Sequence, residues 1–358
     1  MSALSNSTLK TGTGAAAPDN DAVNAPTSAL NKSMLHLPND RWKALEIVFW
    51  LLPVASYFIF PDYLVLVSQI MIVGLFALSL DLILGYAGIV SLGHAAFFGL
   101  GAYTAGLLSV HGWGEPISAL FAAALVAGIV GYIVSFLVVR GQDLARLMVT
   151  LGIGLMLFEA ANKAAFITGG VDGLSGMVMG KLLGVFEFDL VGKTAFWYSL
   201  GVLFILFVVL RRLVNSPFGM SLRGIREGGR RMPAIGANVD RRLKAIFTIG
   251  AMVAGVAGAL LAQTTQFVGL DVLGFPRSAE LLIMLVLGGT GRLYGALIGA
   301  AVFMVAQDRI SGLDPAYWQF YIGLFLVLIV LFARGGVMGG AEKIYHRMVR
   351  GKRRKEAA

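Results

Sequence analysis

Ten long apolar segments dominate this sequence, and they constrain its fold more than any other feature. A helix needs about 20 apolar residues to cross a bilayer. In lipid, only helices and closed barrels satisfy every backbone polar group. The pattern therefore predicts an all-α, polytopic membrane protein with about ten transmembrane segments. We place these segments near residues 44–60, 63–85, 88–110, 117–139, 145–168, 195–211, 244–268, 278–290, 294–310 and 317–334.

The composition excludes several other classes of protein. Hydrophobic residues make up 57% of the chain and charged residues 14%, whereas soluble domains contain about 45–50% and about 25% respectively. A disordered protein, a secreted disulfide scaffold and most soluble enzymes are thereby excluded. There are no cysteines, and the four histidines are scattered. We therefore expect no metal site and no cofactor on this chain.

The basic residues predict the orientation of the chain. If both termini are cytoplasmic, most of the 29 Lys and Arg residues fall on the cytoplasmic side, as the positive-inside rule requires. We expect a polar, disordered cytoplasmic tail over 1–43 and a basic cytoplasmic tail over 341–358. The transmembrane domain between them, 44–340, then has a long external loop at 169–194 and a long cytoplasmic loop at 212–243.

Three polar residues lie close together in the predicted membrane interior. Asp81 precedes a turn at 85–88, and His94 follows it. An ionisable residue inside a membrane indicates a functional site by default, and we hypothesise that these two side chains pair. The alternative is that Asp81 reaches the headgroup level and that His94 bonds to a backbone carbonyl. Ser91 is an acceptable N-cap for a helix that starts near it.

Small residues mark the surfaces where helices are expected to pack closely or slide. Gly291, Gly295 and Gly299 recur every four residues and predict a smooth helix face. Elsewhere Glu159 and Lys163, four residues apart, are expected to neutralise each other. The candidate residues for the translocation path or for packing are Asp81, Ser91, Gly93, His94, Gly99, Gly101, Gly291, Gly295 and Gly299.

The cytoplasmic loop is the most informative connection. Between Arg211 and Lys244 it carries nine basic residues against Glu227 and Asp240. Nucleic-acid binding would call for exposed aromatic side chains for stacking, and Phe218 is the one aromatic residue there. Contact with lipid headgroups is expected. The sharper prediction is a short amphipathic helix that docks on a cytoplasmic partner.

Four motifs in order resemble the M-type permease subunits of branched-chain amino acid ABC importers, over roughly residues 44–340. Residues 91–106 read SLGHAAFFGLGAYTAG, and residues 168–176 read TGGVDGLSG. Residues 216–245 read SPFGMSLRGIREGGRRMPAIGANVDRRLKA and resemble the coupling segment of that family. Residues 285–300 read LVLGGTGRLYGALIGA and resemble its C-terminal glycine motif.

The resemblance implies a bacterial inner-membrane importer with the fold of vitamin B12-type permeases. The implied partners are a second homologous permease, two cytoplasmic ATP-binding subunits that hydrolyse ATP, and a periplasmic substrate-binding protein. Branched-chain amino acids are the implied substrates, with urea or short amides as alternatives. The implied coupling residues are Arg223, Arg226, Glu227, Arg230, Arg231 and Gly236.

The match to the coupling segment is incomplete. Glu227 and Gly236 match the acid and the glycine of the family pattern. Gly228, Gly229 and Pro233 replace helix-forming alanines, which predicts an irregular coupling helix.

Two other classes of function were weighed. An ion-coupled secondary transporter needs several buried acids, and Asp81 and Glu159 are the candidates here. An intramembrane enzyme needs a nucleophile, a base and an orienting acid, and no second acid is spaced to orient His94 beside Ser91. The run Gly192-Lys193-Thr194 lacks the earlier glycine of a phosphate-binding loop, because Glu187 stands there. We therefore expect no ATPase and no enzyme activity from this chain itself.

Overall fold

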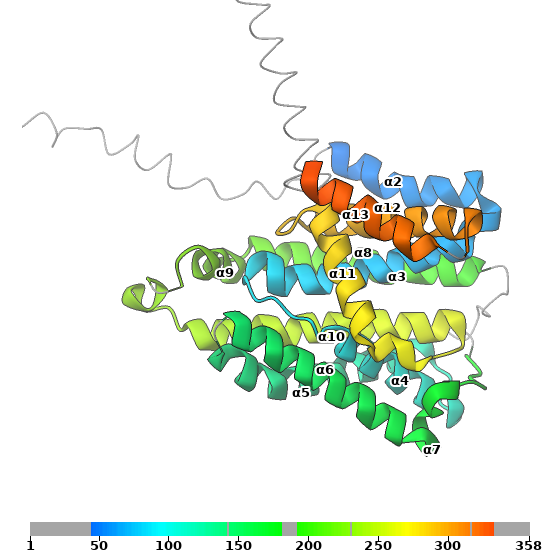
Figure 1. Ribbon diagram of the computed structural model, residues 1–358, viewed down its shortest axis with the longest axis horizontal. Coiled ribbons are helices and arrows are strands. Elements are labelled where there is room, and N and C mark those ends of the chain that lie inside the picture. Colours follow the sequence, from blue (N-terminus) through cyan, green and yellow to red (C-terminus); the bar gives the residue numbers. More distant parts are fainter. Residues whose placement is uncertain (1–43, 142, 181–191, 230, 316, 333–358) are drawn as a thin grey trace, which may run out of the picture. The chain divides into compact units, whose positions relative to one another are not determined.

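The computed structural model describes residues 44–141, 143–180, 192–229, 231–315 and 317–332, and these are predominantly helical (Figure 1). The predicted tails at 1–43 and 341–358 lie outside the described residues. The helices are α2 (Ala44–Ile59), α3 (Leu64–Asp81), α4 (Ala95–Val110), α5 (Pro116–Arg140), α6 (Asp143–Lys163), α7 (Ala165–Thr168), α8 (Lys193–Asn215), α9 (Pro217–Gly228), α10 (Val239–Thr265), α11 (Phe275–Gly288), α12 (Leu293–Leu313) and α13 (Trp318–Phe332).

The predicted all-α fold is confirmed, since each of the ten apolar segments contains a helix. Among the described residues, six helices are long and apolar enough to cross a membrane: α3 with the turns around it, α5, α6, α8, α10 and α12. The helices α2 and α4 are apolar but shorter, and α11 has 14 residues, about 21 Å of helix. The chain is thus a polytopic membrane protein, and the count of about ten crossings stays a prediction.

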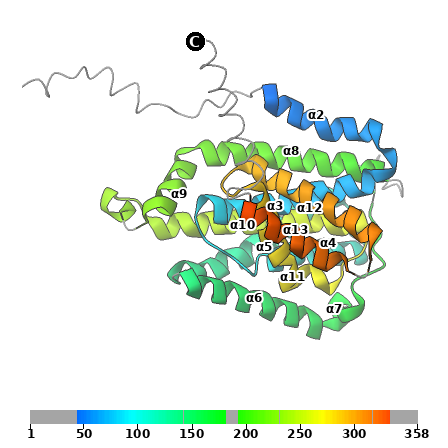
Figure 2. The same ribbon diagram turned by 45° about the horizontal axis from the view of Figure 1, so that its top comes forward.

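The centre of the bundle is α10, which packs against α5, α4 and α3 (Figures 1 and 2). Three glycines allow this close approach on different sides. Gly250 faces Ile83, Gly255 faces Ala127 of α5, and Gly258 faces the backbone of α4. A Cβ on Gly255 would lie 2.5 Å from the Ala127 side chain, so a larger residue would separate these helices.

The second buried helix is α3, which contacts α12, α10 and α8. Beyond Asp81 it continues as a π-helical turn, Leu82–Tyr86. Helical turns of this kind often occur at functional sites. The helix α2 is attached to α8 by two contacts. Trp50 of α2 packs against Phe207 of α8, and Glu46 of α2 forms a 2.7 Å ion pair with Arg211 of α8.

The predicted start of α4 near Ser91 is wrong. The helix begins at Ala95, and His94 is its N-cap residue rather than lying one turn inside. The preceding segment is not helical and runs from the end of α3 to α4 (Figure 1). Gly93 packs here against the backbone of α6, where a Cβ would lie 2.8 Å from the carbonyl carbon of Thr150. A side chain at residue 93 would therefore clash with α6.

The stretch 278–310 forms two helices, α11 and α12, that pack against each other. Gly295 and Gly299 lie at the close contact between these two helices, because Cβ atoms there would lie 2.6 Å from the Gly289 oxygen and 2.8 Å from the Gly288 nitrogen. Gly291 does not belong to this face. It lies in the turn before α12 with φ +79°, so its role is to let the backbone reverse.

Candidate functional site

The predicted coupling segment begins with α9, a short amphipathic helix. Ser216 caps it by accepting a hydrogen bond from the Gly219 amide, and a proline follows at its first position. One face buries Ser221, Leu222 and Ile225 against the bundle. The helix ends at Gly228, and a 3₁₀ turn, Met232–Ile235, follows. The irregularity predicted from Gly228, Gly229 and Pro233 is confirmed.

Arg226 of α9 reaches back into the bundle. Its guanidinium donates a hydrogen bond to the backbone carbonyl of Gly85, 141 residues away in sequence. The same side chain fills the space beside two glycines with left-handed backbone, Gly88 (φ +73°) and Gly291 (φ +79°). A Cβ on Gly88 would lie 3.2 Å from the Arg226 Cγ, and one on Gly291 would lie 3.0 Å from its Nη1.

Asp81 contacts the same turn at Gly291 from the interior of the bundle. Its Oδ1 accepts a 2.7 Å hydrogen bond from the Gly291 amide, and the side chain is fully buried. A Cβ on Gly85 would lie 2.5 Å from that amide nitrogen. Three separate parts of the chain therefore meet: the end of α3, the turn between α11 and α12, and α9. We call Asp81, Gly85, Gly88, Arg226 and Gly291 the α9 junction.

The other predicted coupling residues divide into two groups. Arg223 is exposed but also contacts the bundle, with its guanidinium carbon 5.2 Å from the centre of the Tyr86 ring, a cation–π distance. Glu227 and Arg231 are exposed on the outer side of the segment. Gly236 is exposed with φ +80°, and a Cβ there would meet nothing within 4 Å. Arg230 lies outside the described residues.

Asp81 and His94 do not pair in the part of the chain that the structure describes. The His94 Nε2 lies 2.8 Å from the Ser79 Oγ, and its ring stacks on Phe76. Asp81 is held by Gly291 instead. The alternative of a backbone partner for His94 is also wrong. Ser91 is buried, and its Oγ has no hydrogen-bond partner among the described residues, so it caps no helix.

Because Asp81 and His94 have different partners, we expect their substitutions to act independently. A double-mutant cycle of Asp81→Asn and His94→Leu should give a coupling free energy below about 0.5 kcal/mol. The measurement is the thermal or denaturant stability of the purified membrane complex. A coupling above about 1 kcal/mol would mean that the two side chains interact after all.

The remaining small-residue candidates serve helix packing. Leu273 packs against Gly99, and a Cβ on Gly99 would lie 2.5 Å from the Leu273 Cγ. Gly101 lies against Gly255 of α10, with a Cβ-to-Cα distance of 2.5 Å. Both glycines therefore allow α4 to pack closely against its neighbours.

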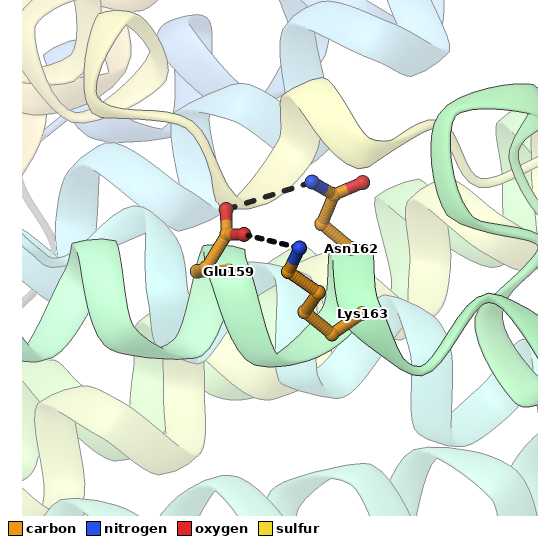
Figure 3. A network of polar contacts seen from close by, with 3 residues as sticks. All are labelled: Glu159, Asn162 and Lys163. Atoms are coloured by element: carbon orange, nitrogen blue, oxygen red, sulfur yellow. Dashed lines mark hydrogen bonds and ion pairs between the residues drawn. The ribbon is translucent and has the colours of Figure 1, made fainter.

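Two ion pairs lie on single helices. Glu159 and Lys163 of α6 are 3.8 Å apart with Asn162 beside them, which confirms the predicted neutralisation (Figure 3). Both are exposed. Arg277 and Glu280 of α11 form a second pair at 3.2 Å, with side chains 24% and 30% exposed. The three-residue spacing of Arg277 and Glu280 on one helix is the signal in the sequence that indicates this pair.

Comparison with known proteins identifies the chain's relatives. A family model described as the permease component of branched-chain amino acid transport systems matches residues 63–331. The high-affinity branched-chain amino acid transport system permease protein LivM of Salmonella typhimurium is 27% identical, over 76% of this chain and 68% of the relative. A probable branched-chain amino acid transport permease protein LivM of Methanocaldococcus jannaschii is 25% identical, over 73% and 89%.

A likeness over a shorter stretch is to the high-affinity branched-chain amino acid transport system permease protein LivH. The LivH of Escherichia coli K12 is 31% identical over 36% of this chain and 41% of the relative. No solved structure is significantly similar to the chain.

Proposed function

The chain belongs to the family of permease components of branched-chain amino acid transport systems, and we propose that it is one of two membrane subunits of an ABC importer. In this proposal the second subunit is a homologous permease, as the likeness to both LivM and LivH supports. Two cytoplasmic subunits bind and hydrolyse ATP, and a periplasmic binding protein delivers the substrate. This chain carries no cofactor and no catalytic residue.

The substrate of the proposed importer is a branched-chain amino acid. Several relatives carry that substrate in their names. Urea and short amides are the alternatives. The chain lies in the inner membrane with both termini in the cytoplasm, which agrees with the distribution of its basic residues.

The observation that carries the proposal is the position of α9. This short helix and the turn after it expose Glu227, Arg231 and Gly236, while α9 is attached to the bundle by its apolar side and by Arg226. A subunit that docks on the exposed side can therefore displace the ends of α3 and α12. ATP binding by that subunit favours one of two permease states if it binds that state more tightly.

The test is reconstitution of the four kinds of subunit in liposomes with ATP inside. We expect leucine uptake that requires ATP, the binding protein and this chain. Uptake that persists without ATP but follows an ion gradient would reject the importer in favour of a secondary transporter.

The outward-facing residues of the segment provide a prediction about docking. Glu227→Lys should reduce leucine uptake at least about tenfold while the spans remain folded, because a buried contact to a charged group contributes about 1.5–3 kcal/mol. Gly236→Leu should do the same, since its left-handed backbone disfavours any side chain. Uptake and subunit assembly are measured in membranes. Normal uptake by both variants would show that α9 and the turn after it are not part of the docking site.

A further inference from the structure

The helix α11 begins deep in the bundle rather than at its end. Before it, the chain leaves α10 at Thr265 and passes through a 3₁₀ turn, Leu270–Leu273. Leu273 packs on Gly99 of α4. Gly99 lies 11 residues before Val110, about 16 Å along the helix from its end. The chain between α10 and α11 therefore descends along α4, and α11 starts at that depth.

Two charged side chains stand in the first turn and a half of α11. The Arg277 Nη1 lies 3.2 Å from the Glu280 Oε2. The Arg277 guanidinium carbon also lies 6.0 Å from the ring centre of Phe98 of α4, which is fully buried. The aromatic ring therefore helps to hold the guanidinium in place.

The surroundings of this pair are polar on one side and open on another. Ser278 accepts a 2.9 Å hydrogen bond from the Ala95 amide at the start of α4. The helices α4, α6 and α11 contact one another, and little of α6 is buried by the rest of the described chain. About a quarter of each side chain of the pair is exposed, so the described chain does not seal the two charged groups.

Structural stabilisation explains the pair poorly. Ion pairs taken out of water gain little over apolar side chains of similar size, because removing the charges from water costs as much as their attraction returns. Charged residues inside membrane proteins instead mark the paths of substrates and ions. Guanidinium groups bind carboxylates through two parallel hydrogen bonds, and a carboxylate is the matching partner for an ammonium group.

We propose that Arg277 and Glu280 form a binding subsite for the zwitterionic head of an amino acid. Arg277 receives the α-carboxylate and Glu280 the α-ammonium, so that the ion pair opens to admit both groups. The inference rests on the proposed function, since it places the site on the path of the imported substrate. It also distinguishes an amino acid from urea or an amide, which lacks both charges.

The experiment uses the reconstituted importer with saturating, leucine-loaded binding protein. Leucine uptake and ATP hydrolysis are measured together. Arg277→Gln and Glu280→Gln should each lower uptake about tenfold or more, the effect of one charge-assisted hydrogen bond. The ATP hydrolysis that the loaded binding protein stimulates should fall much less, because these residues lie away from α9.

A charge swap separates binding from structure. The double variant R277E/E280R keeps an ion pair at the same spacing but reverses the order of the charges. We expect it to assemble and to transport as poorly as the single variants. The matched control is the swap E159K/K163E on α6, for which we expect normal uptake. Uptake by R277E/E280R within about twofold of the wild type would mean that the pair is structural and would overturn the proposal.

A conservative variant covers the case in which the other variants fail to assemble. Arg277→Lys keeps the charge and the ion pair but loses the two parallel hydrogen bonds. We expect it to assemble and to lower uptake about fivefold or more, whereas unchanged uptake would overturn the proposal. A wild-type complex with no ATP-driven uptake would instead reject the proposed function, so the two failures are distinguishable.

Discussion

Replacing Arg226 with glutamine is expected to lower ATP-driven uptake at least about tenfold while the complex still assembles. The guanidinium donates to the Gly85 carbonyl and packs against Gly88 and Gly291. A hydrogen bond to a charged group contributes about 1.5–3 kcal/mol, and this one is partly buried. Without this contact, α9 keeps its apolar attachment through Leu222 and Ile225 but loses its link to the two turns.

The ratio of substrate transported to ATP hydrolysed is the measurement that isolates this link. We expect the Arg226→Gln complex to hydrolyse ATP with little uptake. The matched control is Arg241→Gln, because Arg241 is an exposed arginine of the same basic loop at the start of α10. If the two variants transport the same amount of substrate per ATP hydrolysed, Arg226 does not couple ATP hydrolysis to transport.

The partner glycine offers an independent check on the junction. Gly291→Ala adds a Cβ that would lie 3.0 Å from the Arg226 Nη1, at a residue with φ +79°. The close approach to Arg226 and the strained backbone both disturb the amide of residue 291, which donates a hydrogen bond to Asp81. We therefore expect the same loss of uptake per ATP as in Arg226→Gln. A Gly291→Ala complex with a normal ratio would contradict the view that the turn and α9 act together.

Gly295→Leu is expected to lower the stability of the folded chain by at least about 2 kcal/mol, because inserting side-chain atoms into a close-packed contact forces the helices apart. A Cβ there would already lie 2.6 Å from the Gly289 oxygen and 3.0 Å from the Gly288 oxygen. The remaining atoms of leucine have no space between α11 and α12. The stability of the detergent-solubilised protein and its expression in membranes are the measurements.

The control for this change is Gly201→Leu. Gly201 is an exposed helical glycine of α8, and a Cβ there would meet nothing within 4 Å. We expect its stability to remain near that of the wild type. Gly180 of the external loop is a poorer control, since a Cβ there would lie 3.0 Å from the Gly114 oxygen. Similar losses for Gly295→Leu and Gly201→Leu would contradict the packing explanation.

Local sequence was sufficient wherever one physical property decides the structure. The ten apolar segments became helices because backbone groups in lipid must bond within their own segment. The end of α9 followed from Gly228 and Gly229, whose backbone disfavours a helix. The Glu159–Lys163 pair followed from helical spacing alone.

The predictions that proved wrong share a cause. Ser91 is an acceptable cap locally, but α4 begins at Ala95, after Gly93 has packed against the α6 backbone. Gly291 fits a four-residue repeat, but the chain turns there. Asp81 and His94 flank one turn, yet they bind Gly291 and Ser79. In each case a contact from a distant segment outweighed a local preference.

The sequence by itself determined the class of this protein, the location of its helices and the position of its basic segment, because hydropathy, charge and helical period are properties of neighbouring residues. Only the tertiary structure decided that Arg226 bonds to the carbonyl of Gly85, 141 residues away, and that Asp81 meets a turn 210 residues away. Those contacts depend on how α3, α9 and the α11–α12 turn pack, and no local pattern encodes the relative placement of three separate segments.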